Sequence, residues 1–163
     1  MSALDEPFMR AALEEAQRAR DAGEVPVGAV ITAEGRIIAR GHNETIGACD
    51  PTAHAEVVAL RRAATALRAP RLPDVDVYVT LEPCAMCVGA LIQARVRRLV
   101  FACRDPKAGA VVSLFSLASE PRLNHRIPFE EGHLADESRA LLQDFFRERR
   151  EIDADNVLRR TPR

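Results

Sequence analysis

The sequence predicts an α/β protein whose mixed sheet is covered by helices on both faces. Short apolar, β-branched runs alternate with longer helix-like segments, a pattern that favours strands joined through helices. An early pair of apolar runs around Glu34-Gly35 predicts an antiparallel hairpin, so both pairing directions should occur in one sheet. No internal repeat or linker-like stretch interrupts the chain. We therefore expect a single domain over residues 1–150.

The elements are expected to follow one another with short connections. Residues 2–5 followed by Pro7 are typical of a helix start, and Gly23 is expected to end that helix. The segments expected after it are strands over 27–33 and 36–39, a helix over 50–67, a strand over 75–80, a helix over 83–95, a strand over 99–103, a short helix over 112–118, a strand over 127–129 and a helix over 135–150. Residues 151–163 are expected to form a polar, frayed tail.

Composition restricts the class of protein. The chain has 163 residues, of which 47% are hydrophobic and 29% charged, values that exclude a disordered chain. No apolar run is long enough to span a bilayer, and the first ten residues lack the basic and apolar regions of a signal peptide. We therefore expect no membrane association and a cytoplasmic location. The net charge of −1 gives no support for a nucleic-acid partner, although a local basic patch would suffice for one.

Three side chains in two distant segments predict a catalytic zinc site. Cys84 and Cys87 are three residues apart at an expected helix start and therefore share a face, while His54 lies at the start of another helix. Helix N-termini stabilise thiolates, because their free N–H groups favour negative charge. Three protein ligands leave the fourth position of a tetrahedral Zn²⁺ open, which is typical of catalytic rather than structural zinc.

Glu56 is the expected proton carrier of this site. Residues i and i+2 of a regular helix lie about 200° apart, at about 100° per residue, so His54 and Glu56 should not both ligate the metal from helix interior positions. A carboxylate that reaches across the pocket suits proton transfer better than ligation. Ligation by Glu56 would also close the site and prevent catalysis.

A Cys-x-x-Cys pair is by itself a weak signal, shared by structural zinc sites and redox proteins. A structural site would require a fourth ligand, and no candidate lies at zinc-finger spacing. Those candidates are Cys49, Cys103, His42 and His125. We expect Cys103 to be a small buried hydrophobic residue and Cys49 to be a loop thiol.

The His54-Ala55-Glu56 and Pro83-Cys84-Ala85-Met86-Cys87 segments match the H-x-E…P-C-x-x-C signature of zinc-dependent nucleobase deaminases. Longer stretches resemble one branch of that superfamily, the bacterial tRNA-specific adenosine deaminases. These stretches are residues 24–30, 50–56, 78–84, 104–110, 124–126 and 144–150. The resemblance extends over about residues 7–150, most of the chain.

The resemblance implies a three-layer α/β/α cytidine-deaminase-like fold with a mixed five-stranded sheet. It also implies hydrolysis of adenosine to inosine at the wobble position of a tRNA anticodon, with one Zn²⁺ per subunit of a homodimer. By the same resemblance His54, Cys84 and Cys87 hold the zinc, and Glu56 moves protons between water, purine N1 and the departing amino group.

Substrate contacts are implied in the same way. The base is expected to meet Asn43, whose alternative role is a cap or turn, and the main-chain N–H of Ala55. Asp105 matches an RNA-contacting aspartate of the family. Other expected contacts are Lys107, Asn124, His125 and Arg126 at the rim and Arg147, Arg149 and Arg150 at phosphates. For each of these three arginines, a solvated helix face paired with Asp144 and Glu148 is an equally good interpretation.

Three other functions remain open at this stage. A deaminase of free bases or nucleosides, such as guanine or cytosine, would share the zinc ligands and Glu56 but would have no use for the 104–109 loop. A non-enzymatic RNA-binding module with structural zinc would not need Glu56. A thiol–disulfide protein that uses Cys84 and Cys87 would bind no metal.

Overall fold

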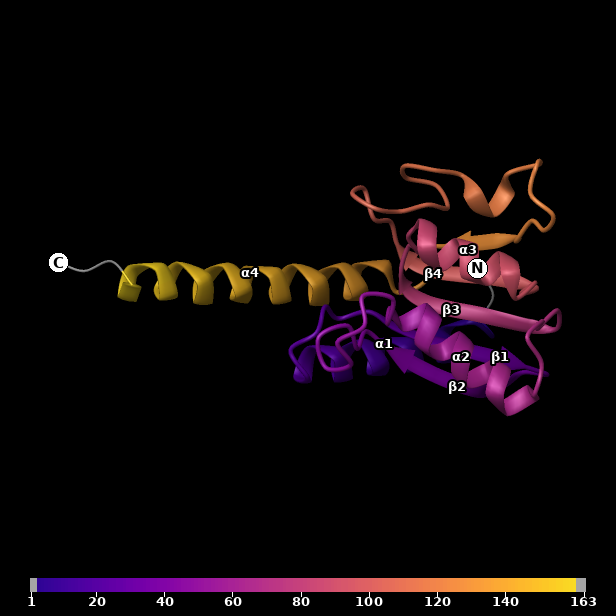
Figure 1. Ribbon diagram of the computed structural model, residues 1–163, viewed down its shortest axis with the longest axis horizontal. Helices are drawn as coiled ribbons and strands as arrows, with labels where there is room; N and C mark the ends of the chain where they lie inside the picture. The colour runs from indigo at the N-terminus through magenta and orange to yellow at the C-terminus, as the bar shows by residue number, and fades with distance from the viewer. Residues whose placement is uncertain (1–2, 161–163) are drawn as a thin grey trace.

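The computed structural model describes residues 3–160 and contains one mixed five-stranded sheet, as the sequence predicts (Figure 1). The strands lie in the order β2-β1-β3-β4-β5. Their bounds are β1 Gly28–Ala33, β2 Arg36–His42, β3 Val75–Leu81, β4 Arg98–Cys103 and β5 Phe129–Glu131. β1 pairs antiparallel with β2 and β3, whereas β3, β4 and β5 are parallel. The carboxyl ends of β3 and β4 therefore meet at one edge.

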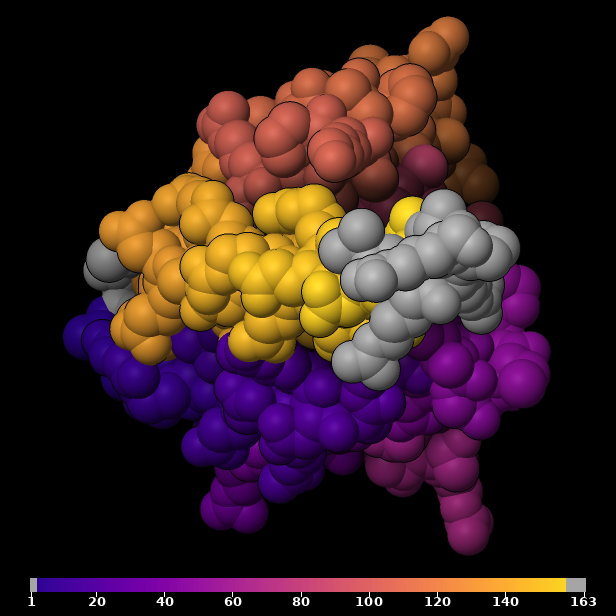
Figure 2. All heavy atoms as spheres, turned by 90° about the vertical axis from the view of Figure 1, so that its left-hand side faces the viewer, coloured from indigo at the N-terminus to yellow at the C-terminus, as the bar shows by residue number. Residues whose placement is uncertain are grey.

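Helices cover both faces of this sheet and complete the expected three layers. Their bounds are α1 Glu6–Asp21, α2 Ala55–Leu67, α3 Ala85–Gln93 and α4 Ala135–Arg160, with a 3₁₀ turn at Leu117–Ser119. α1 and α4 pack together over one face, against β3, and α2 packs on the strands of the other face beside α3 (Figure 1). Figure 2 shows the side from which α4 projects, with α4 in yellow above the indigo N-terminal segment.

The strands divide their apolar side chains between two cores, because successive residues of a strand point to opposite faces. Val77 and Val79 belong to the large core under α2 and α3, whereas Tyr78 between them belongs to the smaller core under α1. Both faces of β3 are buried, so the strand reads as a continuous apolar run rather than an alternation.

Gly41 allows α2 to approach the sheet closely. A Cβ atom at this residue would lie 2.6 Å from the Ala59 nitrogen and 2.8 Å from the Ala55 carbonyl oxygen, both of which are backbone atoms of α2. Any side chain would therefore push the first turns of α2 away from β2. The absence of a side chain at Gly41 therefore lets the first turns of α2 lie close against β2.

Two helices begin later than the sequence predicts. The expected helix over 50–67 begins at Ala55, because the Asp50 carboxylate accepts both the N–H and the hydroxyl of Thr52 in a local turn. The expected helix over 83–95 begins at Ala85 and ends at Gln93, and Cys84 before it is extended. His54 is likewise extended. The sequence placed His54 and Cys84 within their helices, whereas both occupy the capping position.

Three further boundaries are corrected by the structure. The expected helix over 112–118 is replaced by turns, because the N–H groups of Leu114 and Phe115 both donate to the Gly109 carbonyl instead of to the residues four before them, and only Leu117–Ser119 is helical. β5 begins at Phe129, two residues later than expected. α4 continues to Arg160, so the tail expected after residue 150 is helical within the described part of the chain. No proline or glycine lies between Ala135 and Arg160 to stop it.

The structure also bears on the question of membrane spans. None of the helices in the described part of the chain is both long and apolar enough to cross a bilayer.

Arg98 at the start of β4 ties the N-terminus to the sheet. Its guanidinium donates to Asp5 at 2.7 Å, to Asp76 at 3.1 Å and to Glu130 at 3.0 Å. The Tyr78 hydroxyl also donates to Asp5, at 2.6 Å. The hydrogen bonds from Arg98, and then that from Tyr78, hold the pKa of Asp5 below its usual value although burial opposes this. Asp5 thus joins the start of α1 to β3 and β4.

We expect Asp5→Asn to lower the free energy of unfolding at pH 7 by about 1.5–3 kcal/mol, the contribution of hydrogen bonds to a charged group. Because the folded pKa of Asp5 lies below the unfolded value, its stabilisation is complete above the unfolded pKa and is lost as the pH falls through the folded pKa. The difference between wild type and variant should therefore shrink in acid. Urea unfolding at a series of pH values measures it.

Glu6→Gln is the matched control. Glu6 is the next residue and pairs at 2.9 Å with Arg10, and both side chains are about half exposed, so its replacement should change the free energy of unfolding by less than about 0.5 kcal/mol. A difference between wild type and Asp5→Asn that stayed constant down to low pH would contradict the ionic role of Asp5.

Candidate active site

The candidate metal ligands lie where two helices begin side by side. His54 caps α2 and Cys84 caps α3, while Cys87 lies in the first turn of α3. α2 and α3 pack against each other, so their N-termini meet at the same place. Because Cys84 follows β3 by three residues, the sheet fixes the position of the cysteine pair.

The distances between these side chains fit a tetrahedral zinc ion. The Sγ atoms of Cys84 and Cys87 each lie 3.6 Å from Nδ1 of His54, and all three ligand atoms lie within 4.8 Å of one another. Zn–S bonds of about 2.3 Å and Zn–N bonds of about 2.0–2.1 Å at tetrahedral angles require an S···N separation of about 3.6 Å. The residues present therefore fit the ion without rearrangement, and they leave one position of the tetrahedron to another ligand.

None of the alternative fourth ligands joins this group in the described part of the chain. Cys49 is exposed and Cys103 is buried, as expected for a loop thiol and a small core residue. His42 contacts the Glu15 carboxylate at 2.9 Å, and His125 donates to the carbonyl of Val96 at 2.8 Å. The open-site interpretation is therefore favoured over a closed structural site.

The two thiols differ in acidity because they share one proton. The hydrogen bond from Cys87, and then that from His54, lowers the pKa of Cys84 to about 4. The Cys84 thiolate, together with burial, raises the pKa of Cys87. Cys84 in turn raises the pKa of His54. A dication bound by these three atoms would displace the protons that the two thiols and the imidazole still hold.

Glu56 is the only carboxylate in the first turn of α2 and is 4% exposed. Burial is the main cause that raises its pKa, and the nearby Cys84 thiolate adds to it. Glu56 and His54 nevertheless line the same pocket. The expected separation of about 200° did not apply, because His54 is extended rather than helical.

A narrow pocket of about 240 Å³ is lined by two of the candidate ligands, His54 and Cys84, together with Glu56. It is lined by Val25, Val27, Asn43, Thr45, His54, Glu56, Leu81, Glu82, Cys84, Asp105 and Ala108. The Asn43 side-chain oxygen accepts the N–H of Ala55 at 2.9 Å and so caps α2. The Ala55 N–H is thus engaged by Asn43 in this structure, and its contact with a substrate base stays a prediction.

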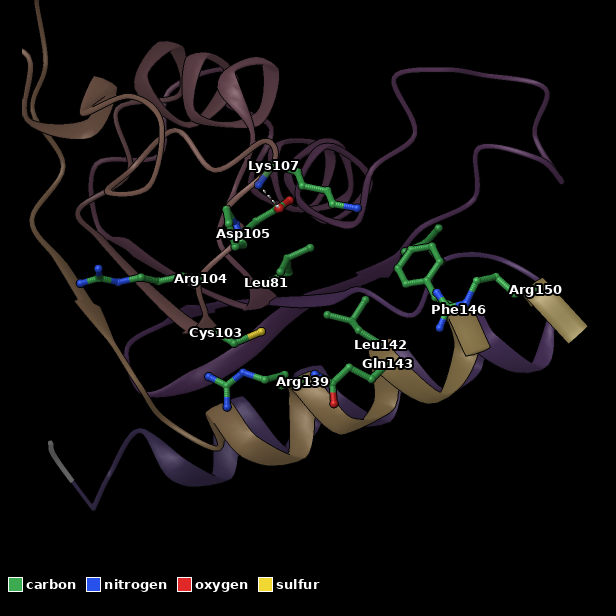
Figure 3. Close-up of a pocket in the computed structure, with 12 residues that line it drawn as sticks. Leu81, Cys103, Arg104, Asp105, Lys107, Arg139, Leu142, Gln143, Phe146 and Arg150 are labelled. Carbon is green, nitrogen blue, oxygen red and sulfur yellow. Dashed lines mark hydrogen bonds between the residues drawn. The ribbon is translucent and has the colours of Figure 1, made fainter. Parts of the chain in front are cut away.

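A wider groove of about 690 Å³ adjoins this pocket and shares Val25, Leu81 and Asp105 with it (Figure 3). It runs between the loop after β4 and the side of α4. The other lining residues are Cys103, Arg104, Pro106, Lys107, Arg139, Leu142, Gln143, Phe146 and Arg150. The floor is apolar. Lys107 and Arg150 place cationic side chains at the rim, whereas Arg104 and Arg139 pair with Glu131 at 2.6 Å and Asp136 at 2.7 Å. The groove therefore suits an anionic ligand with flat apolar parts.

The loop that carries Asp105 and Lys107 forms one rim. The Asp105 carboxylate accepts the N–H of Lys107 at 3.0 Å and that of Ala108 at 3.3 Å through the same oxygen (Figure 3). These bonds fix the loop on itself. Phe146 on the opposite rim is 44% exposed, an unusual exposure for a phenylalanine, and its ring packs edge-on against the buried Phe145.

The three arginines predicted on the last helix have different surroundings. Arg150 lines the groove. Arg147 pairs with Asp144 at 3.0 Å. Arg149 donates to the carbonyl of Gly23 at 2.5 Å and lies over the Phe145 ring, so it joins α4 to the end of α1. Only Arg150 of the three faces the groove.

The structure does not bring Asn124, His125 and Arg126 to this site within one chain. His125 binds the carbonyl of Val96, just before β4 begins, whereas Asp105 follows the end of β4. Because β4 and β5 are parallel, the segment before β5 lies at the opposite end of the strands from the pocket.

Sequence reasoning missed Arg139 and gave Phe146 no role. Both line the groove together with Leu142 and Arg150. Their spacing of three or four residues places them on one helix face, a signal that was available once α4 was recognised.

A second cluster, formed by Asp5, Glu130 and His133, also has the composition of a metal site. Arg98 already donates to both of its carboxylates, however. The guanidinium thus already supplies positive charge to this second cluster. Within the described part of the chain, the His54 cluster is the one that provides two thiols.

Comparisons with known proteins show that the chain is similar in sequence to deaminases. The profile of the MafB19-like deaminases matches residues 4–150. The chain is 46% identical to the tRNA-specific adenosine deaminase of Aquifex aeolicus over 89% of this chain and 95% of the relative. It is 48% identical to that of Agrobacterium fabrum over 88% of this chain and 94% of the relative.

Two solved structures of deaminases are also similar to the chain in fold. A structure from a study of A-to-I editing by tRNA:A34 deaminases has a TM-score of 0.81 at 46% identity and covers 83% of this chain and 99% of that chain. The guanine deaminase of Nitrosomonas europaea has a TM-score of 0.72 at 29% identity, with 86% and 83% covered.

We expect the purified protein to hold one Zn²⁺ per chain. Cys84→Ser, Cys87→Ser and His54→Ala should each weaken zinc binding by at least about 100-fold, because each removes a direct ligand. Metal analysis after dialysis against a competing chelator measures this. Cys103→Ser is the matched control and should retain zinc; loss of zinc in that variant would contradict the assigned ligand set.

Proposed function

The chain belongs to the tRNA-specific adenosine deaminases, and on this basis we propose that it hydrolyses adenosine at the wobble position of tRNA anticodons to inosine and ammonia. The observation that carries the proposal is the junction of two cavities. A narrow pocket is lined by His54, Cys84 and Glu56, with Cys87 beside the first two, and it shares Val25, Leu81 and Asp105 with a groove large enough for neighbouring nucleotides.

We propose that one zinc ion per chain is held by His54, Cys84 and Cys87. When bound, Zn²⁺ supplies Lewis-acid chemistry that makes water nucleophilic near neutral pH. The chain's own contribution is a partly buried site in which the ligand atoms of two cysteines and one histidine lie within 4.8 Å of one another.

Glu56 moves the protons. Its carboxylate takes a proton from the attacking water and delivers it to purine N1, which makes C6 more electrophilic. The oxygen then adds to C6, the bond from C6 to the amino nitrogen breaks, and a second proton passed through Glu56 leaves with ammonia. Water and adenosine are thereby consumed, and inosine and ammonia are formed. Burial suits this role, because a carboxylate of raised pKa accepts and returns protons readily.

The pocket requires an unpaired base. A volume of about 240 Å³ has room for a purine but not for a base pair, so the adenosine must turn out of its stack. Asn43 uses its oxygen to cap α2. Its NH₂ group then supplies the donors that we assign to the ring nitrogens of the purine.

The groove holds the nucleotides on either side. The exposed Phe146 ring offers a stacking surface, and Lys107 and Arg150 meet the phosphates. Asp105 binds its own loop through Oδ1. We assign its other oxygen to a ribose 2′-hydroxyl, a contact that would distinguish RNA from DNA.

A free-base deaminase is the second candidate, and the similarity to a guanine deaminase favours it. Such an enzyme would need the pocket alone. The cationic rim and the exposed Phe146 have no role in binding a neutral base, so we prefer RNA as substrate.

We further propose a homodimer located in the cytoplasm, where the thiols stay reduced. An apolar hollow of about 610 Å³ on the outer side of α2 and α3, which includes Leu60, Ala64 and Ala90, supports a subunit contact there. Asn124, His125 and Arg126 remain predicted RNA contacts, which a tRNA extending beyond one chain would have to reach. Light scattering measures the molecular mass and so tests the dimer.

The decisive experiment uses the zinc-loaded protein and an anticodon stem-loop with adenosine at the wobble position. We expect inosine from wild type and a single-turnover rate about 10²–10⁴-fold lower from Glu56→Gln, with zinc retained. Glu44→Gln, a partly exposed carboxylate that pairs with Arg62, is the control and should match wild type. Deamination of free guanine or cytosine without inosine formation would replace this proposal with the second candidate.

The groove is tested by RNA affinity. Phe146→Ala should weaken binding of the stem-loop by about 1–3 kcal/mol through lost stacking.

Arg150→Ala should reduce the salt dependence of binding by about one phosphate contact. Fluorescence anisotropy at several salt concentrations measures both effects. Arg147→Ala is the matched control because Arg147 pairs with Asp144, and an equal loss in that variant would contradict the assigned groove.

A further inference from the structure

Glu82 lies between the sheet and the metal ligands and has no role in the chemistry proposed above. It directly follows β3, precedes Cys84 by two residues and is 2% exposed. Its carboxylate accepts hydrogen bonds only from the segment after β4. The donors are the N–H groups of Asp105 at 3.0 Å, Val111 at 3.1 Å, Val112 at 2.7 Å and Ser113 at 2.9 Å, and the Ser113 hydroxyl.

The two carboxylate oxygens of Glu82 accept hydrogen bonds from different groups. Oε1 accepts the three consecutive N–H groups of residues 111–113, an arrangement that resembles the backbone nests that bind anions. Oε2 accepts the N–H of Asp105 and the hydroxyl of Ser113. One side chain therefore fixes both ends of the loop that carries Asp105 and Lys107.

The backbone around Glu82 closes tightly on this loop. A Cβ atom on Gly109 would lie 2.3 Å from the Glu82 carboxyl carbon, so a side chain there would displace the Glu82 carboxylate from its hydrogen bonds. Gly109 also forms a β-bridge with Cys84, and the next N–H, of Ala110, donates to the carbonyl of Pro83 at 2.9 Å. The loop is thus held against the segment that supplies a zinc ligand.

We propose that Glu82 is a positioning residue that sets the distance between Asp105 and the metal site and so controls RNA binding without touching substrate. The inference rests on the RNA substrate proposed above. Asp105 lines both the pocket and the groove, and Glu82 is the side chain that binds its N–H. A shift of this N–H would move the Asp105 side chain relative to Cys84 and to the neighbouring ribose.

Glu82→Gln tests the link selectively. The glutamine oxygen can keep the three N–H groups that Oε1 accepts, which leaves the NH₂ group at the Oε2 position. At that position the Ser113 hydroxyl can rotate and accept a hydrogen bond from the glutamine NH₂ group. The Asp105 N–H cannot accept, so it faces the NH₂ group without forming a hydrogen bond. The substitution thus releases Asp105 while retaining most of the nest.

We expect Glu82→Gln to raise KM for the anticodon stem-loop by about tenfold or more, in proportion to one lost hydrogen bond to a charged group. The single-turnover rate at saturating RNA and the zinc content should stay close to wild type, whereas the melting temperature should fall by several degrees because the Asp105 N–H loses its acceptor. Ser113→Ala is the matched control: it removes the hydroxyl but keeps the Asp105 bond, so KM should change less than about threefold.

A double-mutant cycle decides whether the effect passes through Asp105. If it does, Glu82→Gln should have no further effect on KM in an Asp105→Ala background. Independent, multiplying losses would overturn the proposal, and so would an unchanged KM, an equal loss in Ser113→Ala, or a loss of zinc with a fall in the saturated rate. Absence of inosine from the wild-type protein would instead overturn the proposed function, and with it the RNA role of Glu82.

Discussion

The structure depends on the meeting of two helix N-termini at one edge of the sheet. His54 and Cys84 reach the same point because each is the extended residue before a helix, and Cys87 follows one turn into α3. The sheet fixes this arrangement. Cys84 follows β3 by three residues, and Gly41 in β2 lets α2 approach closely enough for His54 to lie beside both cysteines. Free N–H groups at both helix ends favour the negative charge that metal-binding thiolates carry.

Chemistry and recognition are divided between two cavities of different character. The pocket is narrow and holds a buried carboxylate whose pKa is raised, a condition suited to proton transfer. The groove is wider and cationic, and it exposes the Phe146 ring. Leu81 and Asp105 belong to both, so a ligand in the groove lies directly beside the entrance to the pocket. This division explains how a fold shared with free-base deaminases can be adapted to a polymer by the groove alone.

Buried glutamates fix both rims of the pocket. Glu82 binds the N–H groups of the loop after β4, and Glu24, 3% exposed, accepts the N–H groups of Ile46 at 2.9 Å and Gly47 at 2.8 Å on the opposite rim. Hydrogen bonds between carboxylates and backbone N–H groups are charge-assisted and therefore stronger than neutral ones. Loops with little regular structure are thereby held rigidly.

Sequence by itself determined the α/β class and the hairpin, because residue type and local spacing carry that information. It also singled out His54, Cys84 and Cys87 as candidate ligands, whose ligand atoms lie within 4.8 Å of one another in the structure. It could not place Glu56 correctly, since the angle between His54 and Glu56 depends on an extended residue that periodicity does not reveal. Only the tertiary structure decided that Ala55 is bound by Asn43, that Arg150 rather than Arg147 or Arg149 faces the groove, and that residues 124–126 lie at the far end of β4. Those outcomes depend on contacts between segments far apart in the chain, which local patterns do not encode.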